Sequence, residues 1–362
     1  MKYVDDFREA EVCLAMARRI NAAAADRSYR IMEVCGTHTA AIRRFGIPAM
    51  LSSRIRLISG PGCPVCVTSD AYLRNAFRMA ADKNVTIATY PDMLRVPAGG
   101  ISLQDLKAKG ADVRAVNSAL EVLEIARGSK DRMVVFLAVG FETTAPATGI
   151  LVQRAYREKI KNVKVYSAHK TIPPALMSLG KDRALCLDGF LLPGHVSVVI
   201  GVEGYRRLMR SLRLPAVITG FEPLDILSAI GIIVDAARHR KVVLENGYGR
   251  VVSPGGNPKA KALLKEVFTS KDSLWRGLGV IPGSGLFLRK PYDSLDARRV
   301  FGLKEEAGYQ AQGSGCRCAG VLTGKIEPVA CRHFGKQCTP QRPLGPCMVS
   351  REGTCRAFFE TL

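Results

Sequence analysis

The sequence predicts an α/β protein with two similar doubly wound parallel-sheet subdomains and a Cys-rich C-terminal domain. Short β-branched and apolar runs alternate with helical patterns, as they do in parallel sheets. The count and order of these runs repeat in the second part of the chain. With 362 residues, of which 47% are hydrophobic, the chain can form two or three buried cores.

The first series of predicted strands starts after an amphipathic N-terminal helix. Its four strands lie at residues 29–34, 55–59, 85–89 and 112–116. Helical patterns lie between and after them, for example at residues 70–81 and 117–127. Gly128-Ser129-Lys130-Asp131 then interrupts the pattern, which predicts a first domain over residues 1–129.

The second series follows the same order and predicts a second domain over residues 130–234. Its strands lie at residues 133–139, 163–167, 190–192 and 216–219. Gly140-Phe141-Glu142 and Gly220-Phe221-Glu222 follow two of these strands, a weak internal similarity. A third domain over residues 235–362 is rich in glycine, and its segment 313–362 is too loop-rich for an apolar core alone. A covalent or metal link is therefore expected there.

Chemically distinctive residues follow the predicted strand ends. Cys35-Gly36-Thr37-His38 follows the first strand, Gly60-Pro61-Gly62-Cys63-Pro64-Val65-Cys66 the second, and Pro193-Gly194-His195-Val196-Ser197 the seventh. Parallel sheets bind ligands beyond the carboxyl ends of their strands. The thiols and imidazoles are therefore expected at one edge of each sheet, where a functional and a structural role of His169 and His195 are both open.

Cys63 and Cys66 form a C-x-x-C element before a probable helix. A thiolate near a helix N-terminus has a lowered pKa and is a better nucleophile and metal ligand. A redox pair, half of a metal site and two buried thiols all fit this pattern. Cys35 and His38 lack an accompanying Asn or Asp, which disfavours a thiol protease. Cys13 and Cys186 stand alone on apolar patterns and are expected to be buried.

Six of the 11 cysteines lie within 40 residues of the C-terminal segment. They are Cys316, Cys318, Cys331, Cys338, Cys347 and Cys355. The spacing differs from the common ferredoxin runs and lacks the paired hooks of most zinc sites. An iron–sulfur cluster with four ligands and one redox pair is favoured, while zinc and disulfides remain alternatives.

The formal net charge of +21 raises the question of nucleic acid, a membrane surface or an acidic partner. No run of five basic residues and no aromatic–basic interleaving occurs, so a solvated basic surface is favoured and neither nucleic acid nor membrane is expected as a partner. The longest apolar stretch, residues 133–141, is too short to span a bilayer. The N-terminus is unlike a signal peptide, and a cytoplasmic location is expected.

Taken together, these motifs resemble the HypD family of hydrogenase formation proteins. The resemblance covers essentially the whole chain. It includes Cys35-Gly36-Thr37-His38, the run from Gly60 to Cys66, Gly140-Phe141-Glu142-Thr143-Thr144, the Pro193 motif and the tail through Gly345-Pro346-Cys347-Met348-Val349-Ser350 to Cys355. The family assembles the Fe(CN)2CO group of [NiFe] hydrogenases.

The resemblance implies a scaffold and redox protein for this assembly rather than a free-standing metabolic enzyme. Its implied partners are the small chaperone HypC and the cyanide donor HypE, with HypF upstream. Cys35 matches the thiol that binds the mononuclear iron, and Cys63 and Cys66 match a redox pair that could also contact the metal. His38 and His195 are the accompanying polar candidates.

The tail is similar to the [4Fe-4S] domain of ferredoxin:thioredoxin reductase. By this resemblance, the cluster ligands are Cys316, Cys331, Cys338 and Cys355, and Cys318 and Cys347 form a nearby disulfide. Electrons would pass from the cluster through this disulfide to Cys63 and Cys66, and on to the iron at Cys35.

Two other functions fit the same residues. A stand-alone iron–sulfur thiol–disulfide oxidoreductase would use Cys63 and Cys66 without a mononuclear iron. A zinc-stabilised nucleic-acid-binding module would use the basic surface and a zinc-bound tail, and would be colourless when purified without oxygen.

Overall fold

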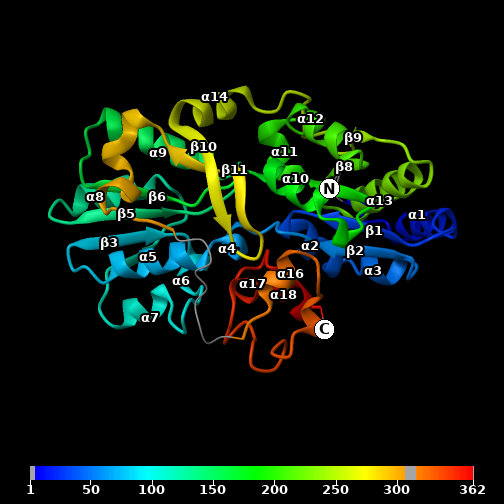
Figure 1. Ribbon diagram of the computed structural model, residues 1–362, viewed down its shortest axis with the longest axis horizontal. Helices are drawn as coiled ribbons and strands as arrows, with labels where there is room; N and C mark the ends of the chain where they lie inside the picture. The colour runs from blue at the N-terminus through cyan, green and yellow to red at the C-terminus, as the bar shows by residue number, and fades with distance from the viewer. Residues whose placement is uncertain (1–4, 306–314, 362) are drawn as a thin grey trace.

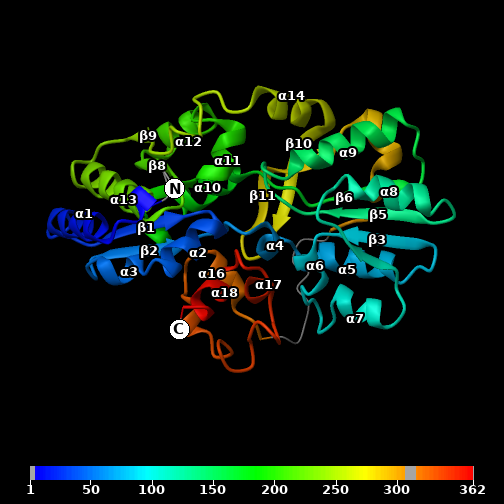
Figure 2. The same ribbon diagram turned by 180° about the vertical axis from the view of Figure 1, so that it is seen from behind.

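A computed structural model describes residues 5–305 and 315–361 of the chain and confirms the mixed α/β fold. Two parallel sheets lie side by side, each with its own helices, and we call them the first and second lobes (Figure 1). The tail lies below the junction between them, in both views (Figures 1 and 2). Residues 313, 314 and 362 of the expected Cys-rich segment lie outside the described residues.

The first lobe contains a five-stranded sheet in the order β2-β1-β7-β8-β9, all parallel. The strands are β1 (Tyr29–Glu33), β2 (Ile55–Ser59), β7 (Gly189–Pro193), β8 (Ala216–Thr219) and β9 (Leu244–Asn246). Its helices are α1 (Ala10–Ala23), α2 (Gly36–Arg44), α3 (Ile47–Met50), α11 (Gly194–Ile200), α12 (Glu203–Leu212) and α13 (Pro223–Arg238), with short turns at η1 (Asp5–Phe7) and η2 (Arg183–Leu185). Helices α1 and α13 pack against each other over one face.

The second lobe contains a four-stranded parallel sheet in the order β4-β3-β5-β6. The strands are β3 (Val85–Thr89), β4 (Val113–Ala115), β5 (Met133–Ala138) and β6 (Val163–Ser167). Its helices are α5 (Asp70–Ala80), α6 (Pro91–Leu94), α7 (Leu103–Ala108), α8 (Glu121–Gly128) and α9 (Ala145–Arg157). Helix α10 (Ile172–Lys181) follows β6 but packs on α12 of the first lobe. Every side chain of β3 and β6 is buried, because helices cover both faces of a parallel sheet.

The predicted strands all occur, but the chain distributes them differently between the two sheets. It forms β1 and β2 in the first sheet, β3 to β6 in the second, and returns to the first for β7 to β9. The expected regions 1–129 and 130–234 therefore each contribute strands to both sheets. The reason is physical: an apolar run predicts a strand, whereas its neighbour is chosen by edge pairing and tertiary packing.

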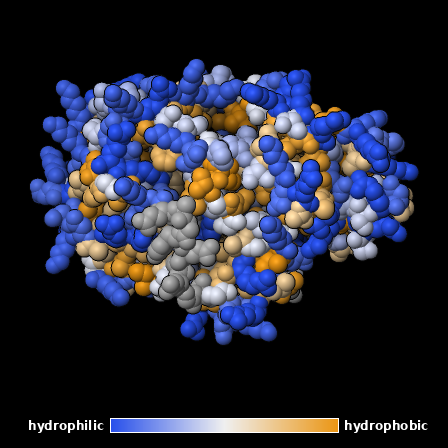
Figure 3. Space-filling model, in the orientation of Figure 1, coloured by the Kyte–Doolittle hydropathy of each residue, from blue (hydrophilic) through white to orange (hydrophobic). Residues whose placement is uncertain are grey.

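The hairpin of β10 (Phe268–Trp275) and β11 (Gly279–Leu288) lies between the lobes (Figure 1). It follows α14 (Pro258–Val267) and leads into η3 (Lys290–Leu295) and α15 (Ala297–Val300). The tail contains α16 (Cys318–Leu322), η4 (Pro328–Ala330), α17 (Pro346–Val349) and α18 (Thr354–Phe359). Hydrophilic residues cover the outer ends of the face in Figure 3, and hydrophobic ones reach the surface in its middle.

Within the described ranges, no helix combines the length and the apolar character needed to cross a lipid bilayer.

Candidate thiol and iron site

The first sheet places two predicted motifs at its topological switch point. The chain order reverses between β1 and β7, and parallel sheets bind ligands at such a point. Cys35 follows β1 and precedes α2, while His195 lies in the first turn of α11, directly after β7. The strand order therefore brings together the two motifs, which are about 160 residues apart in the sequence.

The loop before Cys63 packs directly on the backbone of Cys35. The Gly36 N–H donates to the Gly62 carbonyl at 3.1 Å. A Cβ atom at Gly62 would lie 2.3 Å from the Cys35 nitrogen, so only glycine fits there. The two thiol motifs after β1 and β2 thus form one unit.

Cys63 and Cys66 form a disulfide around the short helix α4 (Pro64–Val67). Both residues are buried, and the Cys66 N–H donates to the Cys63 sulfur at 3.2 Å. The proline at the first helical position suits this turn because it needs no N–H partner. The geometry is therefore compatible with a reversible dithiol–disulfide pair.

Cys35 is held beside a buried carboxylate that sequence reasoning missed. Glu33 accepts hydrogen bonds from the Cys35 N–H at 2.9 Å and from the Thr39 hydroxyl. Burial raises the pKa of Glu33 to about 7 and that of the Cys35 thiol to about 12. Without a metal the thiol is therefore neutral, and a bound cation would favour the thiolate. Glu33 could have been found as a carboxylate within an apolar strand.

An aromatic stack joins the two predicted histidines. The Phe221 ring lies between those of His38 and His195, with centroid distances of 4.7 Å and 4.2 Å. Nε2 of His38 lies 2.9 Å from the Gly220 carbonyl. Burial lowers the pKa of His38 to about 4, so the ring is neutral, whereas His195 lies exposed. Phe221 was noted in the sequence only as part of a repeat.

Five tail cysteines line one pocket of about 310 Å³. They are Cys316, Cys318, Cys331, Cys338 and Cys355. Cys347 does not line the pocket, but its thiol is hydrogen-bonded to those of Cys318 and Cys355. The Cys318 thiol is also hydrogen-bonded to that of Cys316. Over residues 5–305 and 315–361, no three His, Cys, Asp or Glu side chains are arranged to hold a single metal ion.

The tail docks on both thiol motifs of the first lobe. Helix α17, which carries Cys347, packs on α4, and α18 packs on α2. A Cβ at Gly36 would lie 2.3 Å from the Glu352 carbonyl oxygen, and the Thr37 hydroxyl donates to the Glu352 carboxylate at 3.1 Å. Glu352 is a further contact that the sequence did not indicate. The tail therefore packs on α2, which follows Cys35, and on α4, which contains Cys66.

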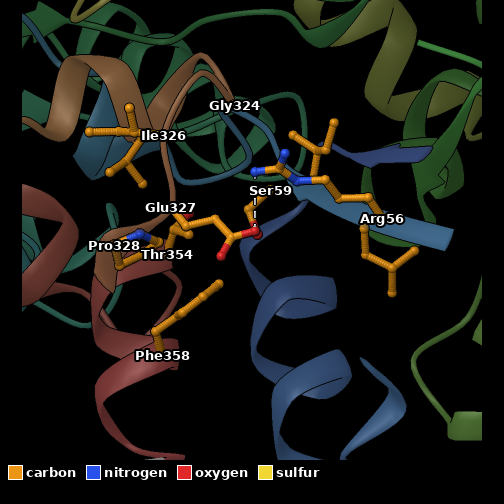
Figure 4. Close-up of a pocket in the computed structure, with 11 residues that line it drawn as sticks. Arg56, Ser59, Gly324, Ile326, Glu327, Pro328, Thr354 and Phe358 are labelled. Carbon is orange, nitrogen blue, oxygen red and sulfur yellow. Dashed lines mark hydrogen bonds and ion pairs between the residues drawn. The ribbon is translucent and has the colours of Figure 1, made fainter. Parts of the chain in front are cut away.

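A second pocket, of about 280 Å³, lies between β2 and the tail (Figure 4). Arg56 and Glu327 form an ion pair of 3.3 Å across it. Its remaining walls are mostly apolar, and it contains no thiol or imidazole. The pocket lies where the tail packs on the first lobe, and it is not a candidate reactive site.

The two isolated cysteines differ from each other. Cys13 is buried in α1, as predicted, but Cys186 is exposed, so the prediction for it was wrong. Cys186 ends the short η2 turn in a left-handed backbone conformation, with φ of 46°. An apolar sequence pattern there reflects its neighbours in the turn and not the orientation of Cys186.

Comparison with known proteins identifies the family of this chain. The family model HypD, described as "Hydrogenase formation hypA family", matches residues 11–361. The chain belongs to this family. Its membership in the HypD family confirms the resemblance inferred from the motifs and places the chain among hydrogenase formation proteins.

Several curated relatives are similar over nearly the whole chain. The "Hydrogenase maturation factor HypD" of Azotobacter vinelandii is 44% identical, over 99% of this chain and 96% of the relative. The "Hydrogenase expression/formation protein HupD" of Azotobacter chroococcum mcd 1 is 43% identical over the same shares. The HypD of Rhodobacter capsulatus is 41% identical, over 99% of this chain and 98% of the relative.

Proposed function

We propose that this HypD-family chain is the scaffold on which the Fe(CN)2CO group of [NiFe] hydrogenases is assembled, in complex with HypC and with cyanide supplied by HypE. The observation that carries the proposal is the junction of three thiol motifs. The Cys35 loop packs on the loop before Cys63, and the tail docks on the helices that follow both.

The iron under assembly is the cargo of this site. Cyanide and CO are strong-field ligands, and a soft thiolate is a suitable anchor for the iron that carries them. Cys35 would supply one thiolate and HypC another. The buried Glu33 and Thr39 hold the Cys35 backbone in position, and the neutral His38 avoids placing a positive charge beside a cationic metal.

The tail would hold a [4Fe-4S] cluster through Cys316, Cys331, Cys338 and Cys355, which all line its pocket. When bound, such a cluster supplies electrons one at a time. Cys318 also lines this pocket and contacts both Cys316 and Cys347, and α17, which carries Cys347, packs on α4. The Cys63–Cys66 disulfide could thus take up two electrons beside the iron-binding thiol.

The proposal is tested by replacing Cys35 with Ser in the full chain, purified with HypC without oxygen. We expect Cys35→Ser to lose the infrared bands of iron-bound cyanide and CO, because a hydroxyl is a poor ligand for this soft site. Cys186→Ser, at the exposed isolated cysteine, should keep them. Bands of normal intensity in Cys35→Ser would contradict the proposal.

A second candidate function is a stand-alone iron–sulfur thiol–disulfide oxidoreductase. The observation in its favour is that Cys63 and Cys66 are already joined as a disulfide next to the tail thiols. Iron analysis separates the two functions. A [4Fe-4S] cluster alone accounts for four irons per chain, and the scaffold binds one more.

A further inference from the structure

His38 has an imidazole nitrogen without a partner in the interior of the first lobe. Its side chain is fully buried, at 0% exposure. Nε2 lies 2.9 Å from the Gly220 carbonyl, whereas Nδ1 is buried and has no hydrogen-bond partner among the described residues. Buried polar atoms are nearly always paired, so an orphaned one indicates a missing partner such as a water molecule or an ion. Nδ1 of His38 therefore needs an explanation.

The Gly220 carbonyl fixes the position of the proton on this ring. A carbonyl oxygen can only accept, so Nε2 carries the hydrogen and donates it to Gly220. Burial lowers the pKa of His38 to about 4, against the Gly220 and Thr219 carbonyls, which raise it, so the ring is uncharged near neutral pH. A neutral imidazole protonated at Nε2 has a free lone pair at Nδ1. His38 thus offers an electron pair and not a proton.

This lone pair shares one turn of α2 with the Cys35 thiol. Cys35 is the N-cap residue of α2, and His38 is the third residue of the helix. Burial raises the pKa of the Cys35 thiol to about 12, and the backbone N–H groups of His38 and Thr37, which face its sulfur, act in the opposite direction. Nδ1 is joined to the His38 backbone nitrogen through only three carbon atoms. The thiol and the imidazole are therefore neighbours at the start of α2.

The surroundings of the ring are those of a metal-binding histidine. Such a histidine almost always donates its other N–H to a carboxylate or a backbone carbonyl, which fixes the tautomer and the orientation of the ring. Gly220 supplies this carbonyl, and the Phe221 ring stacks on His38 with centroids 4.7 Å apart. The ring of His195 is separated from His38 by Phe221. His38 is therefore the imidazole that is already oriented beside Cys35.

We propose that Nδ1 of His38 binds the iron under assembly, so that Cys35 and His38 form a C-x-x-H pair of ligands. The inference rests on the scaffold function proposed above. Two cyanides, one CO and the thiolates of Cys35 and HypC supply five ligands, and iron with strong-field ligands favours six. Imidazole is a suitable ligand for iron. His38 gives its lone pair to the sixth position and keeps its Nε2 proton, so this residue transfers neither a proton nor an electron.

The first test examines the ring without iron. The five histidines of the full chain are labelled with nitrogen-15, and long-range proton–nitrogen correlation spectra report the tautomer of each ring. The signal of His38 is the one that is retained when each of the other four histidines is replaced with Gln. We expect the neutral Nε2–H form near neutral pH. An Nδ1–H form would overturn the proposal, because Nδ1 would then have no lone pair to give.

The second test repeats these spectra after the wild-type chain has been loaded with Fe(CN)2CO in complex with HypC. Low-spin iron(II) is diamagnetic, so the signals stay sharp. We expect a large shift at Nδ1 of His38 and none at His169, whose Nδ1 is also buried and unpartnered among the described residues. An unshifted His38 signal in the loaded complex would overturn the proposal and leave the scaffold function standing. A chain that takes up no iron with cyanide and CO would overturn both.

The His38→Gln variant distinguishes a ligand from a structural residue. The Gln amide still reaches Gly220 as a donor but has no lone pair in place of Nδ1. Removal of an outer-shell partner costs about 10–100-fold in metal affinity, so loss of a ligand should lower iron retention on dialysis at least about tenfold and shift the cyanide and CO infrared bands.

The matched control is His169→Gln, at a buried imidazole that bonds to Thr148 in the second lobe. It should retain the iron and leave the infrared bands unchanged. Unchanged iron retention and bands in His38→Gln, or equal losses in the two variants, would overturn the proposal. If His38→Gln does not fold, the spectra of the loaded wild type decide.

Discussion

At the scale of single residues, burial moves acids and bases in opposite directions. It raises the pKa values of Glu33 and Glu142 to about 7 and lowers those of His38 and His169 to about 4. The desolvated charged form is the one that is disfavoured in each case. All four side chains are therefore mostly uncharged between about pH 4 and 7 in the folded chain.

His169 allows this effect to be measured away from the thiol site. Its Nε2 lies 2.8 Å from the Thr148 hydroxyl, and its folded pKa is about 4 against 6.5 for an exposed histidine. Below pH 6.5 the unfolded chain binds a proton that the folded chain does not, so the unfolding free energy falls as the pH drops toward 4. His169→Gln should remove about 3 kcal/mol of this acid loss.

Urea unfolding at neutral pH and near pH 4 checks this prediction. His239→Gln, at an exposed histidine, is the control and should retain the full acid loss. The prediction fails if His169→Gln loses as much stability in acid as the wild type does.

At the scale of elements, the β10–β11 hairpin connects parts of the chain that are distant in sequence. Lys170 of the second lobe donates to the Ser273 hydroxyl at 2.8 Å and to the Leu274 carbonyl at 2.9 Å. Arg276 at the end of the hairpin pairs with Asp70 at 2.6 Å. The sequence predicts strands from apolar alternation, but glycine-rich β11 and charged β10 carry little of this pattern, so the hairpin was not predicted.

Arg276 should hold α4 in place. Its backbone N–H donates to the Val67 carbonyl at 2.9 Å and its Nε to the Thr68 carbonyl at 3.0 Å. Arg276→Met should destabilise the chain by about 3 kcal/mol, because the largely buried Asp70 carboxylate and the Thr68 carbonyl lose their side-chain partner, whereas the backbone bond to Val67 stays. It should also speed amide hydrogen exchange in α4 more than in β1.

Arg206→Met is the matched control for this variant. Arg206 pairs with Glu203 on the exposed face of α12, and such surface pairs contribute about 0–1 kcal/mol. Equal stability and equal exchange in both variants would show that Arg276 does not hold α4.

At the scale of the whole molecule, the tail is attached to the first lobe by close backbone contact and side-chain stacking. The Arg43 guanidinium lies 3.2 Å from the centre of the Phe358 ring, and Gly36 leaves room for Glu352. Both contacts connect α2, which begins after Cys35, to the tail segment that contains Cys355. The position of the tail cysteines relative to Cys35 thus depends on these contacts between α2 and the tail.

Gly36→Ala tests the contact between α2 and the tail. The added Cβ would lie 2.3 Å from the Glu352 carbonyl oxygen, so the backbone must shift to make room for it. We expect a loss of about 1–3 kcal/mol in stability. Faster hydrogen exchange should be confined to α2, α17 and α18. Gly128→Ala has no atom within 4 Å of the new Cβ and should leave both quantities unchanged. Unchanged amide hydrogen exchange in Gly36→Ala would contradict close packing of the tail on α2.

The sequence by itself determined the α/β class, the eight apolar strands and the motifs that identify the family, because these depend on local periodicity and on residues adjacent in the chain. Only the tertiary structure decided which strands share a sheet, how the Cys35 and Cys63 loops and the tail meet, and which of two equivalent glutamates is buried. Strand pairing, close backbone approach and desolvation are set by partners from distant parts of the chain. Glu142 and Glu222 share one sequence context, and only their surroundings separate a buried carboxyl with a raised pKa from one in an ion pair with Arg8.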